Sequence, residues 1–220
     1  MIIASLTSWP PRIHCVARAV KSLLAQTIRP DAIELNLAVP EFPNREQDIP
    51  KELRDLHDKG LVNVNWLPQN ENVFKKTAPA FRKYMGMDFV LFSCDDDTEY
   101  APTYIRRMLE ELDEHDAFCP YECAVGFITA IRSRVITPLF WRAVTPELVA
   151  NGIGDAYVNH YLRHVKADCV FKDVQDIKGL VNQFGAYTSP NSERVGGYTK
   201  ERVKRAQDLS RAIFENQRRK

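Results

Sequence analysis

The order of apolar segments is the feature that most constrains how this chain can fold. Up to residue 112, short apolar runs typical of strands alternate with segments whose apolar residues recur at helical spacing. Such an alternation predicts a parallel sheet with helices on both faces. The expected strands are residues 2–6, 32–39, 62–67 and 89–93, and the expected helices are residues 14–26, 49–60, 75–86 and 104–112.

The second half of the chain is less regular. Residues 124–131 read as a strand, and residues 151–164 as a loop that leads into a helix. Residues 182–199 are rich in Gly, Ser, Asn and Tyr, a composition typical of a mobile loop. Residues 200–220 are expected to form an amphipathic basic helix.

Composition excludes several classes of protein. The 220 residues are 45% hydrophobic with a formal net charge of +1, which fits one globular domain and argues against a dedicated nucleic-acid binder. Residues 1–13 lack the basic start of a signal peptide, and no run approaches the ~20 apolar residues of a membrane helix. The five cysteines are an odd number, and no second pair completes a zinc site with Cys119 and Cys123. We therefore expect reduced thiols and a cytoplasmic location.

Three adjacent carboxylates, Asp95, Asp96 and Asp97, follow the expected strand 89–93. Ligands of open parallel sheets bind beyond the carboxyl ends of the strands, so these side chains should face such a crevice. Like charges placed side by side need a positive partner, and hard oxygen ligands suit Mg²⁺ or Mn²⁺ with substrate phosphates completing the shell. The alternative is that they cap the following helix or occupy a solvated turn.

Three segments resemble the GT-A glycosyltransferases, especially small bacterial and viral members near family 2. They are SLTSWPPRI at 5–13, DFVLFSCDDDTEYAPTYI at 88–105 and GDAYVNHYL at 154–162. The resemblance implies an α/β fold of GT-A type, a Rossmann-like, mainly parallel twisted sheet flanked by helices. It also implies one catalytic domain over residues 1–220. Its parts would be a nucleotide-sugar-binding half (about 1–100), an acceptor-side half (about 101–180), and a mobile loop with a C-terminal helix (about 181–220).

The resemblance also assigns roles to the aspartates. Asp95 would contact the ribose of the donor and share in the metal site, and Asp97 would coordinate the Mn²⁺ or Mg²⁺ that bridges the diphosphate. Asp96 occupies the variable position of the Asp-x-Asp motif within the donor-binding set.

Other donor contacts come from two segments. Thr7, Ser8 and Arg12 would line the nucleotide pocket, with Arg12 contacting phosphate or base. Lys75 and Lys76 stand where related sequences place a basic donor contact, and the alternative for them is a solvated helix start.

The sequence departs from the family pattern at two points. Many members carry an acid after the second strand, and here only Glu34 and Asn36 are near. Many also supply a late histidine to the metal. His160 and His164 share i, i+4 spacing, but we favour a surface or packing role for them.

The chemistry that the resemblance implies is metal-dependent transfer of a sugar from a nucleotide-sugar donor, with a UDP-sugar favoured. The acceptor would be a hydroxyl of a glycan, or of a lipid-linked or protein-linked acceptor. Asp155 is the candidate base that takes the proton of this hydroxyl, and direct attack would invert the anomeric centre. The alternative for Asp155 is a helix N-cap in a Gly-rich turn.

Competing functions remain open. A sugar nucleotidyltransferase shares this kind of sheet and metal, but its usual Gly-rich loop after the first strand is missing from SWPPR. No GxxxxGK[ST] sequence is present, which excludes a P-loop enzyme. A non-catalytic domain that binds nucleotide sugar or glycan is the remaining alternative.

The C-terminal segment allows two interpretations. The helix expected at 200–220 could dock on an anionic membrane, giving a peripheral membrane contact, or pack its apolar stripe on the rest of the domain. We favour packing. The loop expected at 182–199 would then act as a lid over the bound donor.

Overall fold

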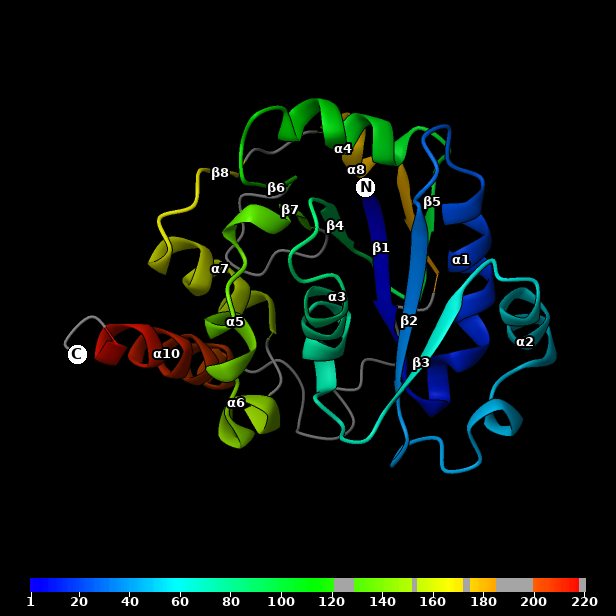
Figure 1. Ribbon diagram of the computed structural model, residues 1–220, viewed down its shortest axis with the longest axis horizontal. Helices are drawn as coiled ribbons and strands as arrows, with labels where there is room; N and C mark the ends of the chain where they lie inside the picture. Colours follow the sequence, from blue (N-terminus) through cyan, green and yellow to red (C-terminus); the bar gives the residue numbers. More distant parts are fainter. Residues whose placement is uncertain (121–128, 152–153, 172–174, 185–199, 218–220) are drawn as a thin grey trace.

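The computed structural model describes residues 1–120, 129–151, 154–171, 175–184 and 200–217 (Figure 1). Its main sheet has seven strands in the order β3-β2-β1-β4-β7-β6-β8. The bounds are β1 (Ile2–Thr7), β2 (Ala32–Ala38), β3 (Asn63–Leu67), β4 (Val90–Ser93), β6 (Ala117–Cys119), β7 (Thr129–Arg132) and β8 (Cys169–Phe171).

The first four strands confirm the predicted parallel sheet. β1 pairs in parallel with β2 and β4, and β2 with β3. That prediction covered the first four strands. Beyond them, β7 runs antiparallel to both β4 and β6, and β6 pairs in parallel with β8, so the sheet as a whole is mainly parallel, as the predicted fold class has it. The described part of the predicted strand 124–131 begins at Thr129. A second sheet, which the sequence did not predict, pairs β5 (Thr98–Tyr100) with β9 (Val181–Gln183).

Both faces of the main sheet are covered, which explains the near-continuous apolar runs in β1 and β4. Ala4 and Leu6 of β1 belong to one core cluster, which includes residues of α1, α2 and α4. Ile3 belongs to the cluster on the other face, with residues of α3, α5, α6, α7 and α10. The helix bounds are α1 (Val16–Leu24), α2 (Lys51–Asp58), α3 (Ala78–Lys83), α4 (Tyr104–Leu112), α5 (Leu139–Arg142), α6 (Pro146–Asn151), α7 (Gly154–His164), α8 (Gln175–Lys178) and α10 (Lys200–Gln217).

Short 3-10 helices precede or link several of these elements. They are η1 (Pro10–Cys15), η2 (Arg45–Asp48), η3 (Asn72–Lys76) and η4 (Ser133–Val135). The helix predicted at 49–60 ends as its sequence indicates: Gly60 takes a φ of +67°, and its N–H donates to the carbonyl of His57 at 2.8 Å. Glycine adopts this left-handed conformation at little cost.

The C-terminal helix α10 packs on the domain, as the favoured interpretation predicts. Figure 1 shows it (red) beside α7, at the side of the molecule away from α2. Phe214 is only 4% exposed, and its ring lies 5.4 Å from that of Tyr157 and 6.0 Å from that of Tyr161. His164 stacks on the same ring at 5.0 Å, which confirms a packing role for this histidine. None of the described helices is both long and apolar enough to span a bilayer.

Candidate functional site

The carboxyl ends of the four parallel strands place the predicted site residues along one edge of the sheet. Thr7 ends β1 and Ser8 follows it, η3 follows β3, and Asp95–Asp97 follow β4. Backbone pairing sets Ser5 beside Ser93, so the segments that leave β1 and β4 start side by side. This is the edge at which open α/β sheets bind ligands.

Asp96 is buried against the loop that follows β1. Its side chain is 1% exposed, and Ser8 Oγ donates to its Oδ2 at 2.6 Å. Arg12 Nε donates to the same oxygen at 3.2 Å, and a terminal nitrogen of Arg12 contacts Oδ1. Burial raises the pKa of Asp96, and the Arg12 charge and the Ser8 hydrogen bond oppose that shift. The position that the resemblance treats as variable is therefore a tightly held carboxylate in this chain.

Arg12 also reaches Asp97. Its Nη1 lies 3.0 Å from Oδ2 of Asp97, which is 1% exposed. Burial lowers the pKa of Arg12, but the carboxylates of Asp96 and Asp97 more than compensate, so its pKa is raised overall. One permanently charged guanidinium thus bridges two adjacent carboxylates.

Asp95 is paired with Lys76. The Lys76 ammonium contacts Oδ1 of Asp95, and both side chains are largely buried. The backbone N–H of Asp95 donates to the hydroxyl of Tyr100 at 2.7 Å, which holds the turn after β4. Within the described residues, Arg12 and Lys76 are thus positive partners of the three aspartates, and both come from other segments of the chain.

Lys75 has a different partner from its neighbour. Its ammonium contacts Oε2 of Glu41, with 3% and 6% of the two side chains exposed. The alternative of a solvated helix start is therefore wrong for this pair of lysines. The sequence carried no local signal for the Lys75–Glu41 contact, because Glu41 lies in the turn after β2.

Thr7 and Asn36 of β2 form hydrogen bonds within the sheet. Thr7 Oγ1 donates to the carbonyl of Asn36 at 2.7 Å. Asn36 Nδ2 donates to Ser5 Oγ at 3.0 Å, and Asn65 Nδ2 donates to Asn36 Oδ1 at 3.0 Å. Asn36 is 1% exposed, so this residue belongs to a buried polar network between β1, β2 and β3.

Glu34 extends that network and is fully buried. It accepts hydrogen bonds from Asn63 (2.8 Å), Asn65 (2.6 Å), Lys83 (2.8 Å) and Tyr84 (2.5 Å). Burial raises its pKa, but Lys83 and the neutral donors outweigh burial, and the pKa is lowered overall. Glu34 therefore ties β2 and β3 to α3.

Asp155 lies in the first turn of α7, the helix predicted within residues 151–164. Its side chain lies outside the described residues, so its role as a base stays a prediction. The same helix contacts η3, since the ring of Tyr157 lies 5.4 Å from that of Phe74, the residue before Lys75. The start of α7 is thereby attached to the element that carries both lysines.

The strand β9 reaches the aspartates from the C-terminal half. Phe184 follows β9, and its N–H donates to the carbonyl of Asp97 at 2.8 Å. The guanidinium of Arg18 lies 4.3 Å from the centre of the Phe184 ring. The lid predicted at 182–199 lies outside the described residues from 185 onward.

Comparisons with known proteins bear on the fold. No family model matches the chain, and no curated protein matches its sequence. The structure is similar to the mannosyltransferase PcManGT from Pyrobaculum calidifontis in complex with GDP-Man and Mn²⁺. That alignment has 11% identity over 96% of this chain and 69% of the other, with a TM-score of 0.59.

The structure is also similar to S. aureus TarS 1–349 in complex with UDP-GlcNAc, with 12% identity over 98% of this chain and 71% of the other, and a TM-score of 0.52. The chain spans 34% and 55% of two further TarS structures that it matches. These similarities agree with the strand order and the helix layers, and the chain has the predicted α/β fold of GT-A type.

Proposed function

We propose that this protein is a glycosyltransferase that moves a sugar from a nucleotide-sugar donor to an acceptor hydroxyl with the help of a divalent cation. The observation that carries the proposal is the set of three carboxylates paired with Arg12 and Lys76 at the carboxyl edge of a GT-A-type sheet. Two similar structures support the donor class, since PcManGT holds GDP-Man with Mn²⁺ and TarS holds UDP-GlcNAc. We favour a UDP-sugar.

The donor atoms fit a cation that is shared with a diphosphate. Asp95 and Asp97 offer only hard carboxylate oxygens, which Mg²⁺ and Mn²⁺ prefer. The described ranges contain no group of three or more His, Cys, Asp or Glu side chains that could hold a metal ion. Asp95 and Asp97 would therefore hold the cation together with phosphate oxygens. When bound, it would stabilise the negative charge that forms on the departing nucleoside diphosphate.

Arg12 and Lys76 have a defined part in this proposal. Each now neutralises a carboxylate that the cation would share, Asp97 and Asp95 respectively. On donor binding both would turn to phosphate oxygens, for which a guanidinium and an ammonium are suitable donors. Arg12 would keep its contact with Asp96, so its guanidinium stays oriented while Asp97 is released.

The acceptor side of the proposal rests on Asp155. A carboxylate in the first turn of α7 would accept the proton of the attacking hydroxyl, because an alcohol is a weak nucleophile until that proton leaves. Direct attack from the face opposite the diphosphate gives a product of inverted configuration.

The test is a donor screen with UDP-, GDP- and TDP-sugars in Mn²⁺ or EDTA, scoring release of nucleoside diphosphate. We expect turnover of one donor class, loss of turnover in EDTA, and loss in Asp97→Asn but not in the control Asp58→Asn on the exposed side of α2. Undiminished turnover in EDTA would overturn the metal part. Donor binding without any turnover would instead identify a binding domain, and formation of a nucleotide sugar from a nucleoside triphosphate would identify a nucleotidyltransferase.

A further inference from the structure

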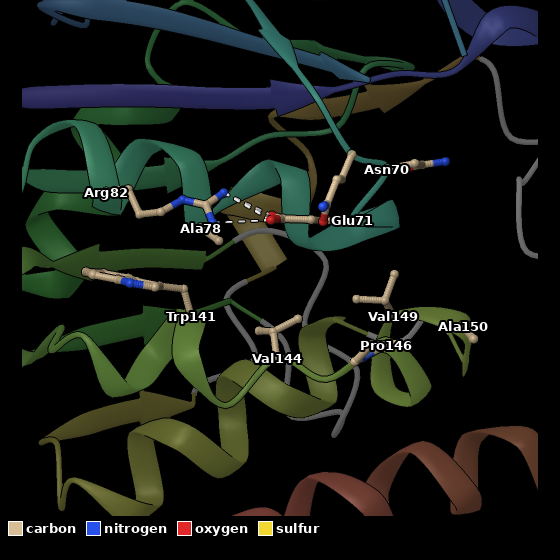
Figure 2. Close-up of a pocket in the computed structure, with 10 residues that line it drawn as sticks. Asn70, Glu71, Ala78, Arg82, Trp141, Val144, Pro146, Val149 and Ala150 are labelled. Carbon is tan, nitrogen blue, oxygen red and sulfur yellow. Dashed lines mark hydrogen bonds and ion pairs between the residues drawn. The ribbon is translucent and has the colours of Figure 1, made fainter. Parts of the chain in front are cut away.

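A pocket of about 290 Å³ opens between α3 and the pair α5 and α6. Figure 2 shows its two walls, with Glu71 and Arg82 on one side and Val144, Pro146 and Val149 on the other. The lining residues are Gln69, Asn70, Glu71, Ala78, Arg82, Trp141, Val144, Pro146, Val149 and Ala150.

The first wall is polar but electrically neutral. The guanidinium of Arg82 donates from Nη1 to Oε1 of Glu71 at 3.2 Å and from Nη2 to Oε2 at 3.1 Å. The two charges compensate each other, while both side chains keep exposed surface. The amides of Gln69 and Asn70 extend this wall with further donors and acceptors.

The second wall is apolar, with the half-buried indole of Trp141 at one end. The pocket therefore offers planar hydrogen-bonding groups opposite an aromatic ring and aliphatic side chains. A pyranose has the matching pattern, with hydroxyl groups around its rim and C–H groups on its faces. A nucleotide phosphate would instead require uncompensated positive charge.

The walls are held together before any ligand arrives. Asn72 takes a φ of +50°, and its Nδ2 donates to the carbonyl of Val149, a residue of the second wall, at 2.8 Å. The backbone N–H of Asn72 donates a hydrogen bond to Asn70 Oδ1 at 2.9 Å. The rings of Phe81 and Phe140 pack at 5.1 Å and join α3 to α5. A largely pre-formed site of this size suits a small ligand.

The chain segments that form the two walls are close in sequence to residues of the proposed site. Asn72 starts η3, which ends at Lys76, the partner of Asp95. The other wall continues from α6 into α7, whose first turn contains Asp155. A ligand in this pocket would therefore lie beside the elements that carry the proposed donor and acceptor groups.

We propose that this pocket binds one sugar residue of a neutral acceptor glycan, with Trp141 against a face of the ring and Asn70, Glu71 and Arg82 at its hydroxyls. The acceptor role rests on the proposed function, whereas the binding of a neutral sugar does not.

The experiment is titration of the intact protein, without donor or metal, with a panel of neutral oligosaccharides: maltotriose, mannotriose, galactotriose and N-acetylchitotriose. Binding is followed by calorimetry. Trp141→Leu should weaken binding about tenfold, because it removes an aromatic contact, while Trp141→Phe should retain most of the affinity. UDP binding in Mn²⁺ should be the same in all three proteins, and thermal unfolding verifies that the variants fold.

Each other outcome overturns the inference. It is wrong if no panel member binds at millimolar concentration, if a bound sugar is insensitive to Trp141→Leu, or if Trp141→Leu weakens UDP equally. Binding of an apolar peptide or lipid in preference to every sugar would also overturn it. If sugar binding depends on Trp141 but no donor is ever turned over, the proposed function fails and the glycan site stands.

Discussion

Arg12 and Asp96 form a multipoint contact between two loops that are 84 residues apart in the chain, with Arg12 Nε 3.2 Å from Asp96 Oδ2 and a second nitrogen at Oδ1. The same guanidinium reaches Asp97 at 3.0 Å. Ion pairs of Arg12 thus join the loop after β1 to the turn after β4. Changes to either loop should alter the properties of both.

Lys76→Gln should alter metal and nucleotide binding in opposite directions. Removing the ammonium frees Asp95, so Mn²⁺ alone should bind about tenfold tighter, as expected for loss of a competing charge in a partly buried site. UDP should bind more weakly in saturating Mn²⁺, because a phosphate contact is lost. Calorimetric titration measures both, with the exposed Lys51→Gln as control. Unchanged or weaker Mn²⁺ binding would show that Lys76 does not compete for this site.

Lys75→Gln should lower the free energy of unfolding. It leaves the carboxylate of Glu41 buried without its charged partner, and breaking a buried ion pair in this way costs about 3–5 kcal/mol. Lys51→Gln breaks an exposed pair with Asp55 and should change the free energy of unfolding far less, because solvent screens that pair. Urea unfolding of both variants gives the comparison. Equal free energies of unfolding would contradict a structural role for the Lys75–Glu41 pair.

Asp155→Asn should lower the rate of transfer by ~10²-fold or more, the usual contribution of a general base. The amide keeps the size of the side chain but cannot accept the proton, so the donor affinity should be unchanged. Single-turnover kinetics with bound donor separate the two effects. Loss of donor affinity with normal transfer would make Asp155 a binding residue, and a product of retained configuration would contradict inversion.

The lowered pKa of Glu34 predicts that the free energy of unfolding decreases in acid. Because its folded-state pKa lies below the ordinary value of 4.5, the ionised carboxylate stabilises the protein above that pH. This contribution should be lost as pH falls below 4.5 through the lower folded-state pKa. Free energies of unfolding between pH 7 and pH 3 measure the effect, and Glu34→Gln should show a shallower decline. Parallel curves for the two proteins would mean that Glu34 titrates alike in both states.

The sequence by itself determined the elements of the first half and the place of the aspartates. Apolar periodicity reports which face of a segment is buried, and this local property located β1 to β4, α1, α2 and α4. Gly60 marked the end of α2 because glycine adopts the left-handed conformation of a helix C-cap most easily. In the structure its φ is +67°, an angle that strains residues with a Cβ. Asp95, Asp96 and Asp97 were placed at the sheet edge because they directly follow a strand.

Only the tertiary structure decided how those elements pair and which charges meet. The antiparallel position of β7 between β4 and β6, and the pairing of β5 with β9, depend on backbone hydrogen bonds between distant segments. The sequence of a short strand does not indicate which other strand it pairs with. The contacts of Asp96 with Arg12, Asp95 with Lys76 and Glu41 with Lys75 likewise arise where loops converge. A charged side chain in a sequence indicates its need for a partner, but the partner is chosen by the fold that brings two loops within hydrogen-bonding distance.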